Sequence, residues 1–194
     1  MFPDPGDRQP APQPLRLVQQ FVNTRDIENG GDELSAPAEL ARVLRRIGVT
    51  EKPLSGLGDG HLQAAVQLRE ALRELLLANN RGRLGRRALD VLGRSAGAGQ
   101  LSIQFHEDGG ATLVPQATGL DGALGRIVAV AFTAMADGSW QRLKACRRDI
   151  CRWVFYDRSK NRSSTWCAMS VCGNRTKIRR YRGLDSPGVL QSTP

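Results

Sequence analysis

Four cysteines are the residues of this 194-residue chain whose type and spacing most clearly indicate chemistry. They form two close pairs, Cys146 with Cys151 and Cys167 with Cys172, and fifteen residues separate the pairs. Two such pairs can surround one ion with four thiolates, and thiolate softness favours zinc over hard cations. Because the protein then fills all four tetrahedral positions, we expect one structural Zn²⁺ with no bound water available for catalysis.

Two other interpretations of the cysteines remain open at this point. Four thiolates also suit an iron–sulfur cluster, and two disulfides would use the same residues. The N-terminus carries five prolines within fifteen residues and no apolar signal-peptide segment, so we expect a cytoplasmic protein in a reducing compartment, which favours the metal. Residues 127–136 form the longest largely apolar run, about half of what crosses a bilayer, so we expect no membrane contact.

Basic side chains gather around the cysteines. Residues 141–182 carry a formal charge of +11, whereas the whole chain is +9, so the remainder is slightly acidic at −2. A charge concentrated in one segment predicts a nucleic-acid partner, and duplex DNA is our leading expectation. The side chains expected to contact it are Arg152, Arg158, Lys160, Arg162, Arg175, Lys177, Arg179, Arg180 and Arg182.

Aromatic residues in the same segment leave alternatives open. Trp153 and Trp166 could stack on single-stranded nucleic acid or RNA, although we expect them chiefly to cover the metal. A protein-interaction adaptor whose basic face docks an acidic partner is a second class. A small-molecule-sensing or enzymatic N-terminal domain is a third, because the rest of the chain is large enough to hold a pocket.

The residues after the last cysteine predict a short basic helix. Gly173 is expected to permit a left-handed or closely approaching backbone beside the thiolate. Asn174 is expected to cap a helix that begins at Arg175. Ile178 and Tyr181 are then expected to hold the opposite face of that helix against the cysteine module.

The elements that position these residues follow from hydrophobic periodicity. Helical spacing predicts helices over residues 15–28, 40–47, 60–78 and 84–92, with Asp59 as the N-cap of the third, and a buried helix over 127–135. Alternation over 101–105, a turn at 108–110 and the apolar run that follows predict a β-hairpin. The predicted fold class is α+β: a mainly helical N-terminal domain with a β-hairpin, followed by a small four-cysteine zinc-finger module.

Nothing in the helical region has the spacing of a catalytic site. His61 is expected at a helix start and His106 on the polar side of a strand, each as an ordinary surface residue. The glycine patterns at 56–58 and 97–99 lack the strand before, the helix after and the Lys-Ser/Thr ending of a phosphate loop. We therefore expect a protein that is not an enzyme.

The sequence from Cys151 to Lys177, which contains Cys172-Gly173-Asn174-Arg175, resembles the CGNR zinc-finger family. Phe21-Val-Asn-Thr-Arg25, together with residues 40–48, is similar to the ABATE domain that precedes this finger. The resemblance implies a bacterial protein of a family proposed to regulate transcription under stress, with a nucleic-acid-binding finger. A small-molecule effector of the N-terminal domain is a further expectation. The predicted division is a disordered Pro-rich arm (1–14), an ABATE-like helical domain (15–140), a CGNR-type finger (141–182) and a disordered tail (183–194).

Overall fold

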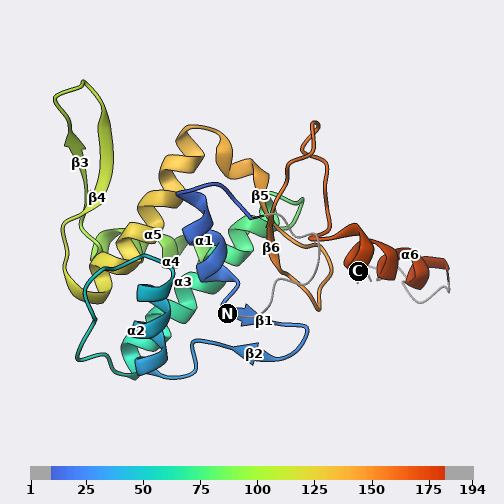
Figure 1. The fold of residues 1–194 in the computed structure, drawn as a ribbon, viewed down its shortest axis with the longest axis horizontal. Coiled ribbons are helices and arrows are strands. Elements are labelled where there is room, and N and C mark those ends of the chain that lie inside the picture. The colour runs from blue at the N-terminus through green and yellow to red at the C-terminus, as the bar shows by residue number, and fades with distance from the viewer. Residues whose placement is uncertain (1–9, 182–194) are drawn as a thin grey trace, which may run out of the picture.

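The part of the chain that the structure describes is a helical body with three small antiparallel hairpins and a C-terminal module that contains the cysteines. The computed structural model describes residues 10–181, without the side chains of Arg179 and Arg180 (Figure 1). The body comprises α1 (Leu15–Val22), β1 (Arg25–Asp26), β2 (Gly31–Asp32), α2 (Pro37–Arg46), α3 (Asp59–Ala78), α4 (Arg86–Ala98), β3 (Leu101–Phe105), β4 (Ala111–Pro115) and α5 (Gly119–Ala136). A 3₁₀ turn (Ser139–Arg142), β5 (Leu143–Ala145), β6 (Val154–Tyr156), a π-helical segment (Met169–Gly173) and α6 (Asn174–Tyr181) follow. The predicted fold class is confirmed.

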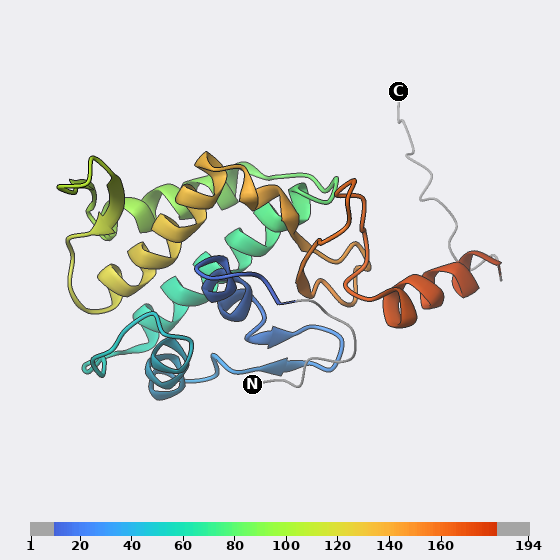
Figure 2. The same ribbon diagram turned by 45° about the horizontal axis from the view of Figure 1, so that its top comes forward.

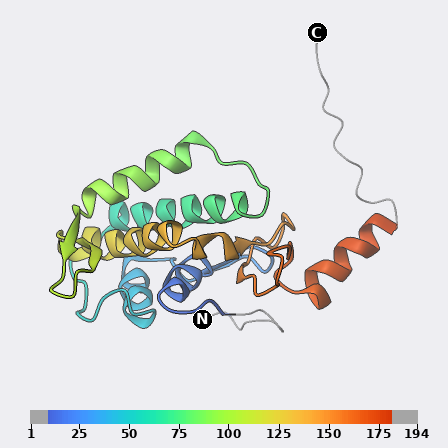
Figure 3. The same cartoon turned by 90° about the horizontal axis from the view of Figure 1, so that it is seen from above.

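Helix α3 is the centre of the body. Leu68, Leu72 and Leu76 recur at a four-residue spacing and are fully buried, because α1, α2 and α4 pack around this helix. Helix α5 packs against α1 and α4, and Figure 3 shows α3, α4 and α5 running along the length of the molecule. This helical layer provides the surface on which the cysteine module is built.

Helix α1 ends earlier than predicted, at Val22 rather than near Glu28. The Asn23 side chain bonds the backbone of Val154, and Thr24 Oγ1 donates to the carbonyl of Phe21, so the polar side chains after Val22 are used outside the helix. The chain then forms the β1–β2 hairpin, whose turn contains Gly30 at a φ of 75°. Periodicity could not reveal this end, because the partner of Asn23 lies 131 residues away.

Two helix starts also differ from the prediction. Gly58, rather than Asp59, is the residue before α3, and its N–H donates to Nδ1 of His61 over 3.0 Å. Helix α4 begins at Arg86 and continues to Ala98, so it is displaced and longer than the predicted 84–92. The predicted surface positions of His61 and His106 are confirmed, and His106 Nε2 lies 2.8 Å from Thr112 Oγ1.

By length and composition alone, helix α5 could cross a membrane. However, 56% of it is buried inside the protein, as expected of a core helix. The prediction of a buried helix over 127–135 is wrong for one face. Phe132 and Met135 are 57% and 42% exposed, because the elements packed against α5 leave this stripe uncovered.

The predicted hairpin is confirmed as β3 and β4, with Leu101 opposite Pro115 and Phe105 opposite Ala111. Gly109 in its turn has a φ of 82°. Preceding α1, Ala11 is buried and its N–H donates to Oε1 of Gln19 over 2.7 Å. The last five residues of the arm predicted to be disordered therefore have defined positions. The rest of that arm (1–9) and the predicted tail lie outside the described residues.

Candidate metal centre and basic surface

The first cysteine pair is placed by the β5–β6 hairpin. Cys146 directly follows β5, and Cys151 lies just before β6 in the antiparallel partner. The Cys146 N–H donates to the carbonyl of Trp153 over 2.9 Å, which extends the ladder by one residue beyond the pair Ala145 and Val154. Both thiols therefore emerge at the end of one hairpin.

The second pair comes from a loop and the π-helical segment after it. Cys167 precedes this segment and Cys172 lies inside it, with the Cys172 N–H donating to the carbonyl of Ala168 over 2.9 Å. A π-turn widens the helix by one residue, and such turns are frequent at functional sites. Here the wide turn brings the second thiol of the pair toward the first hairpin.

The four sulfurs form one compact, buried cluster. All four Sγ atoms lie within 4.8 Å of one another, with 3.7 Å between Cys151 and Cys167 and 3.6 Å between Cys167 and Cys172. Four sulfurs bonded to one zinc at about 2.3 Å would be about 3.8 Å apart at tetrahedral corners. The spacing therefore fits a single tetrahedral ion and is too small for several iron atoms. The cysteines are free thiols, so the disulfide interpretation does not hold.

The pKa values of these thiols shift in opposite directions, because the thiols hydrogen-bond to one another. The pKa of Cys172 is lowered because its sulfur accepts hydrogen bonds, first from the thiol of Cys146, then from the other thiols and from the guanidinium of Arg148. Donation to neighbouring sulfurs, foremost that of Cys146, raises the pKa of both Cys151 and Cys167. A divalent cation binds thiolates, so loading the site requires the remaining protons to leave, and metal affinity must rise with pH.

Aromatic side chains cover the sulfurs, as predicted. Trp153 and Phe155 are buried with the cysteines, and half-buried Trp166 packs against the same cluster. A Cβ on Gly173 would lie 3.3 Å from Cδ1 of Trp166 and would overlap the side chain of Met169. The expected close approach at Gly173 is therefore confirmed, and the left-handed alternative is not needed.

The start of the basic helix differs from the prediction. Asn174 has helical φ and ψ angles of −64° and −42°, so the π-helical segment continues into α6 and Asn174 does not act as a cap. Ile178 and Tyr181 are 50% and 94% exposed, so they do not hold α6 against the cysteine module. Figure 2 shows α6 leaving the body at the end opposite the β3–β4 hairpin.

The body holds the module through amide side chains. At the end of α3, Asn79 Nδ2 donates to the carbonyls of Trp140 and Leu143, both at 2.9 Å. Buried Asn80 donates to the carbonyls of Ala145 and Thr165 at 2.8 and 2.9 Å. The sequence showed these asparagines only as a helix end, because nothing local indicates partners more than 60 residues away.

Asn23, which belongs to the Phe21-Val-Asn-Thr sequence, binds the same module from α1. Its Oδ1 accepts the Val154 N–H over 2.8 Å, and its Nδ2 donates to the Val154 carbonyl over 2.9 Å. Gln19 Nε2 donates to the same carbonyl over 3.2 Å. Asn23 therefore pairs with β6 as a neighbouring strand would, and it joins the N-terminal helix to the cysteine module.

Of the side chains predicted to contact nucleic acid, some are exposed or lie against other side chains, and others are paired with carboxylates. Lys160 and Lys177 are exposed, and so is Arg162, whose Nη1 donates to Gln141 Oε1 over 3.1 Å. Arg158 lies over the ring of Tyr156, 5.7 Å from its centroid. The side chains of Arg179 and Arg180, and the whole of Arg182, lie outside what the structure describes.

Two of the predicted contacts are engaged by carboxylates. Arg152 pairs with Asp149, and Arg175 Nη1 lies 2.5 Å from Oε1 of Glu28 in the loop between β1 and β2. The same Glu28 oxygen accepts from Arg148 Nη1 over 2.7 Å. Glu28 was not singled out from the sequence, because its two cationic partners are 120 and 147 residues away.

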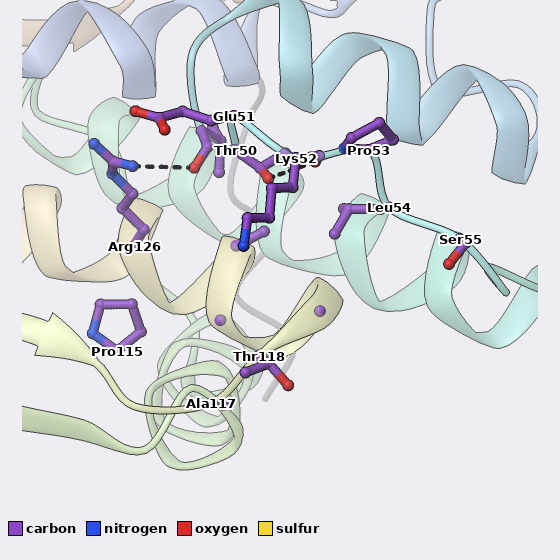
Figure 4. A pocket seen from close by; sticks show the side chains of 14 residues that line it. Thr50, Glu51, Lys52, Pro53, Leu54, Ser55, Pro115, Ala117, Thr118 and Arg126 are labelled. Atoms are coloured by element: carbon purple, nitrogen blue, oxygen red, sulfur yellow. Dashed lines mark hydrogen bonds between the residues drawn. The ribbon is translucent and has the colours of Figure 1, made fainter.

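A separate cavity of about 620 Å³ lies on the body, between the loop 49–55 and the start of α5. Figure 4 shows Lys52, Leu54, Thr118 and Arg126 around it. Arg126 Nη1 donates to the carbonyl of Val49 over 3.3 Å and so ties α5 to the loop. This cavity offers room for a small molecule in the N-terminal region.

The buried four-thiol cluster, its aromatic cover and the helix that follows define a zinc-finger protein with an N-terminal helical body. Residues 142–183 match the model of the CGNR zinc finger. Residues 15–138 match the ABATE family, whose description is "Putative stress-induced transcription regulator". The chain belongs to the ABATE family and carries a CGNR zinc finger. Among curated proteins, none matches this chain.

Proposed function

We propose that the protein is a zinc-dependent transcription regulator that binds duplex DNA in the cytoplasm through its C-terminal finger. The observation that carries the proposal is the position of α6, which continues directly from the segment that contains Cys172. In this proposal Cys146, Cys151, Cys167 and Cys172 hold one Zn²⁺, and the ion fixes the start of the basic helix. We propose no catalytic role, because a regulator needs only binding.

The charge distribution supports a polyanionic partner. Residues 141–182 carry +11, and four thiolates around one Zn²⁺ would lower this value by about two. Lys160 and Lys177 are exposed on the loop between the cysteine pairs and on α6, so both can reach phosphates without breaking a described ion pair. Phosphate contacts of this kind give affinity and orientation but no sequence preference.

A fluorescence-anisotropy titration of the zinc-loaded protein with duplex DNA tests this proposal. We expect affinity to fall steeply between about 50 and 200 mM salt, because bound phosphates release counterions. Lys160→Gln and Lys177→Gln should each reduce the slope of log K against log salt by about one. The matched control is Arg87→Gln, which removes one exposed charge from α4. Affinity that does not change with salt would overturn the proposal.

The same assay separates the alternative partners. Competition between duplex DNA, single-stranded DNA and RNA distinguishes phosphate recognition from stacking on tryptophan. If the finger is instead a protein adaptor, a pull-down with an acidic partner should survive nuclease treatment. The proposed DNA-binding function predicts that nuclease removes any such complex.

The cavity beside loop 49–55 favours a second candidate function, the binding of a small-molecule effector by the N-terminal domain. Its volume of about 620 Å³ lies within the range of ligand sites. Mass spectrometry of the native protein should reveal a bound metabolite that Ser55→Trp, which fills the cavity from an exposed position, eliminates. A metabolite retained equally by both proteins would exclude this cavity as its site.

A further inference from the structure

The finger contains a second cavity, which borders the metal cluster at Cys167. It has a volume of about 550 Å³, and its walls come from β6, from the loop 157–166 and from the start of the π-helical segment. This space, called the loop cavity below, lies between the two hydrophobic clusters of the protein. Tyr156 packs against the core of the body, whereas Trp166 packs against the cluster that contains the cysteines.

The chemistry of the lining suits a flat, polar-edged aromatic group. Half-buried Tyr156 and Trp166 provide aromatic rings, and Ser163, Ser164 and Ser170 provide hydroxyl groups that can both donate and accept hydrogen bonds. Such side chains can bind the face and the edges of a nucleobase. An aliphatic ligand has no polar edge and could not form hydrogen bonds with these hydroxyl groups.

The one carboxylate in the wall is already neutralised. Asp157 Oδ2 accepts from Lys144 Nζ over 2.7 Å and from the Ser164 N–H over 3.0 Å. Its Oδ1 accepts the Ser159 N–H over 2.9 Å. Both side chains of this ion pair are almost fully buried, and the positive charge of Lys144 balances that of Asp157, so the wall carries no net negative charge that would repel an anionic ligand.

Further hydrogen bonds from Lys144 and Arg142 hold the backbone of the loop that forms the cavity. Lys144 Nζ also donates to the carbonyl of Arg162 over 2.6 Å, and Arg142 Nη1 donates to the carbonyls of Asp157 and Ser159 at 2.9 and 3.0 Å. A loop held at so many carbonyls keeps its shape without a ligand. Binding therefore costs little ordering of the protein.

Cationic side chains lie on the segments that form the loop cavity. Arg158 lines it, and exposed Lys160 and Arg162 lie on the same loop. Ser170, also in the wall, belongs to the π-helical segment that continues into α6 with Arg175 and Lys177. The loop cavity is therefore formed by the same segments that carry the basic side chains expected to bind phosphates.

We propose that the loop cavity accepts one unpaired base of the bound nucleic acid, with its ring against Trp166 and its phosphate at Arg158. This inference rests on the proposed nucleic-acid binding and specifies its substrate: DNA that contains a bulged, mismatched or single-stranded nucleotide binds more tightly than continuous duplex. Removal of a base–aromatic stacking contact typically weakens binding by about 5- to 100-fold.

The test compares two probes with the zinc-loaded, full-length protein. One is a fully paired 20-mer duplex, and the other carries a single bulged 2-aminopurine, whose fluorescence falls when the base stacks. We expect the bulged duplex to bind about tenfold more tightly than the paired one, within the range of one stacking contact. We also expect its 2-aminopurine signal to be quenched on binding.

Two variants locate the effect. Ser170→Tyr fills the loop cavity from an exposed position, and Ser35→Tyr places the same side chain at an exposed site on the body as the matched control. Trp166→Leu removes the stacking ring, and its zinc content shows whether the metal cluster survives. We expect Ser170→Tyr and zinc-loaded Trp166→Leu to abolish the preference for the bulge and the quenching, whereas Ser35→Tyr retains both.

The outcomes distinguish this inference from the proposed function. Salt-sensitive binding of the paired duplex with no preference for the bulge overturns the loop cavity as a base site and leaves the proposed function intact. A preference that survives Ser170→Tyr unchanged also overturns it, because the base must then bind elsewhere. If wild-type protein binds neither probe, the proposed function fails and this inference fails with it.

Discussion

Individual buried charges in this protein join segments that are distant in sequence. Arg69 on α3 is fully buried, and its guanidinium binds both carboxylate oxygens of Asp32 on β2 at 2.6 and 2.9 Å. Arg73, one turn later, donates to the carbonyl of Val22 over 2.7 Å and to that of Arg152 in the finger over 3.1 Å. A buried cation is tolerated only when such partners compensate for its lost hydration.

The ion pair of Asp32 with Arg69 gives a stability prediction. Asp32→Asn leaves buried Arg69 without its bidentate partner, so the free energy of unfolding at pH 7 should fall by about 2 to 3 kcal/mol. Glu39→Gln is the control, because it breaks an exposed pair with Arg42 that contributes less than about 1 kcal/mol. Urea denaturation measures both changes. A loss no larger than that of the control would contradict the structural role of the pair.

The ion pair of Asp32 with Arg69 also determines how the free energy of unfolding changes with pH. Partial burial alone would raise the pKa of Asp32, but the hydrogen bonds from Arg69 and from the Leu34 N–H lower it below its ordinary value of 3.8. The stabilisation is therefore present above about pH 4 and is lost as the pH falls through the lower folded-state pKa. The difference between wild type and Asp32→Asn should consequently shrink below pH 4.

At the level of elements, the β1–β2 hairpin contacts the basic finger through one carboxylate. Glu28 lies in the loop of this hairpin and pairs with Arg148 beside the cysteines and with Arg175 on α6. A phosphate that approaches Arg175 must compete with Glu28. The N-terminal region therefore limits how much of the positive charge of α6 is available to a polyanion.

Glu28→Gln tests this competition. We expect tighter binding of duplex DNA and a slope of log K against log salt that is steeper by about one to two, because Arg148 and Arg175 are released for phosphate contacts. Glu39→Gln changes the net charge equally at a site on α2 and should leave the slope unchanged. Weaker binding by Glu28→Gln would show that the carboxylate positions α6 for DNA instead of competing with it.

How far the sequence predicted these elements depends on the range of their contacts. The cysteine cluster and the β3–β4 hairpin were predictable, because their residues lie close together along the chain. The C-terminal end of α1 and the roles of Asn23, Asn79 and Asn80 were not, because the backbone partners of these asparagines lie 61 to 131 residues away. The exposed face of α5 was missed for the same reason, since apolar composition does not show which sides its neighbours cover.

On the scale of the whole molecule, the finger and the helical body share one hydrophobic core. Leu143, Ala145 and Val154 of the β5–β6 hairpin belong to the cluster that contains Phe21 and Leu72 of the body. The cysteines and their aromatic cover form the adjoining cluster. Loss of the metal should therefore weaken the body as well as the finger.

Thermal unfolding followed by helical circular dichroism measures this coupling. We expect chelation of zinc to lower the midpoint by at least about 6 °C, which corresponds to roughly 3 kcal/mol for a chain of this size. Added zinc should restore the original midpoint. A helical transition that is identical with and without zinc would mean that the finger and the body unfold independently.

The most direct test of the zinc-dependent finger combines metal analysis with DNA binding in one experiment. Zinc content and the affinity for duplex DNA are measured for the intact protein, for chelator-treated protein and for Cys167→Ser. The structure predicts one zinc per intact chain, little in the other two samples and a loss of affinity in both, because α6 is no longer fixed to the four sulfurs. Duplex binding that persists unchanged without the metal would contradict the account.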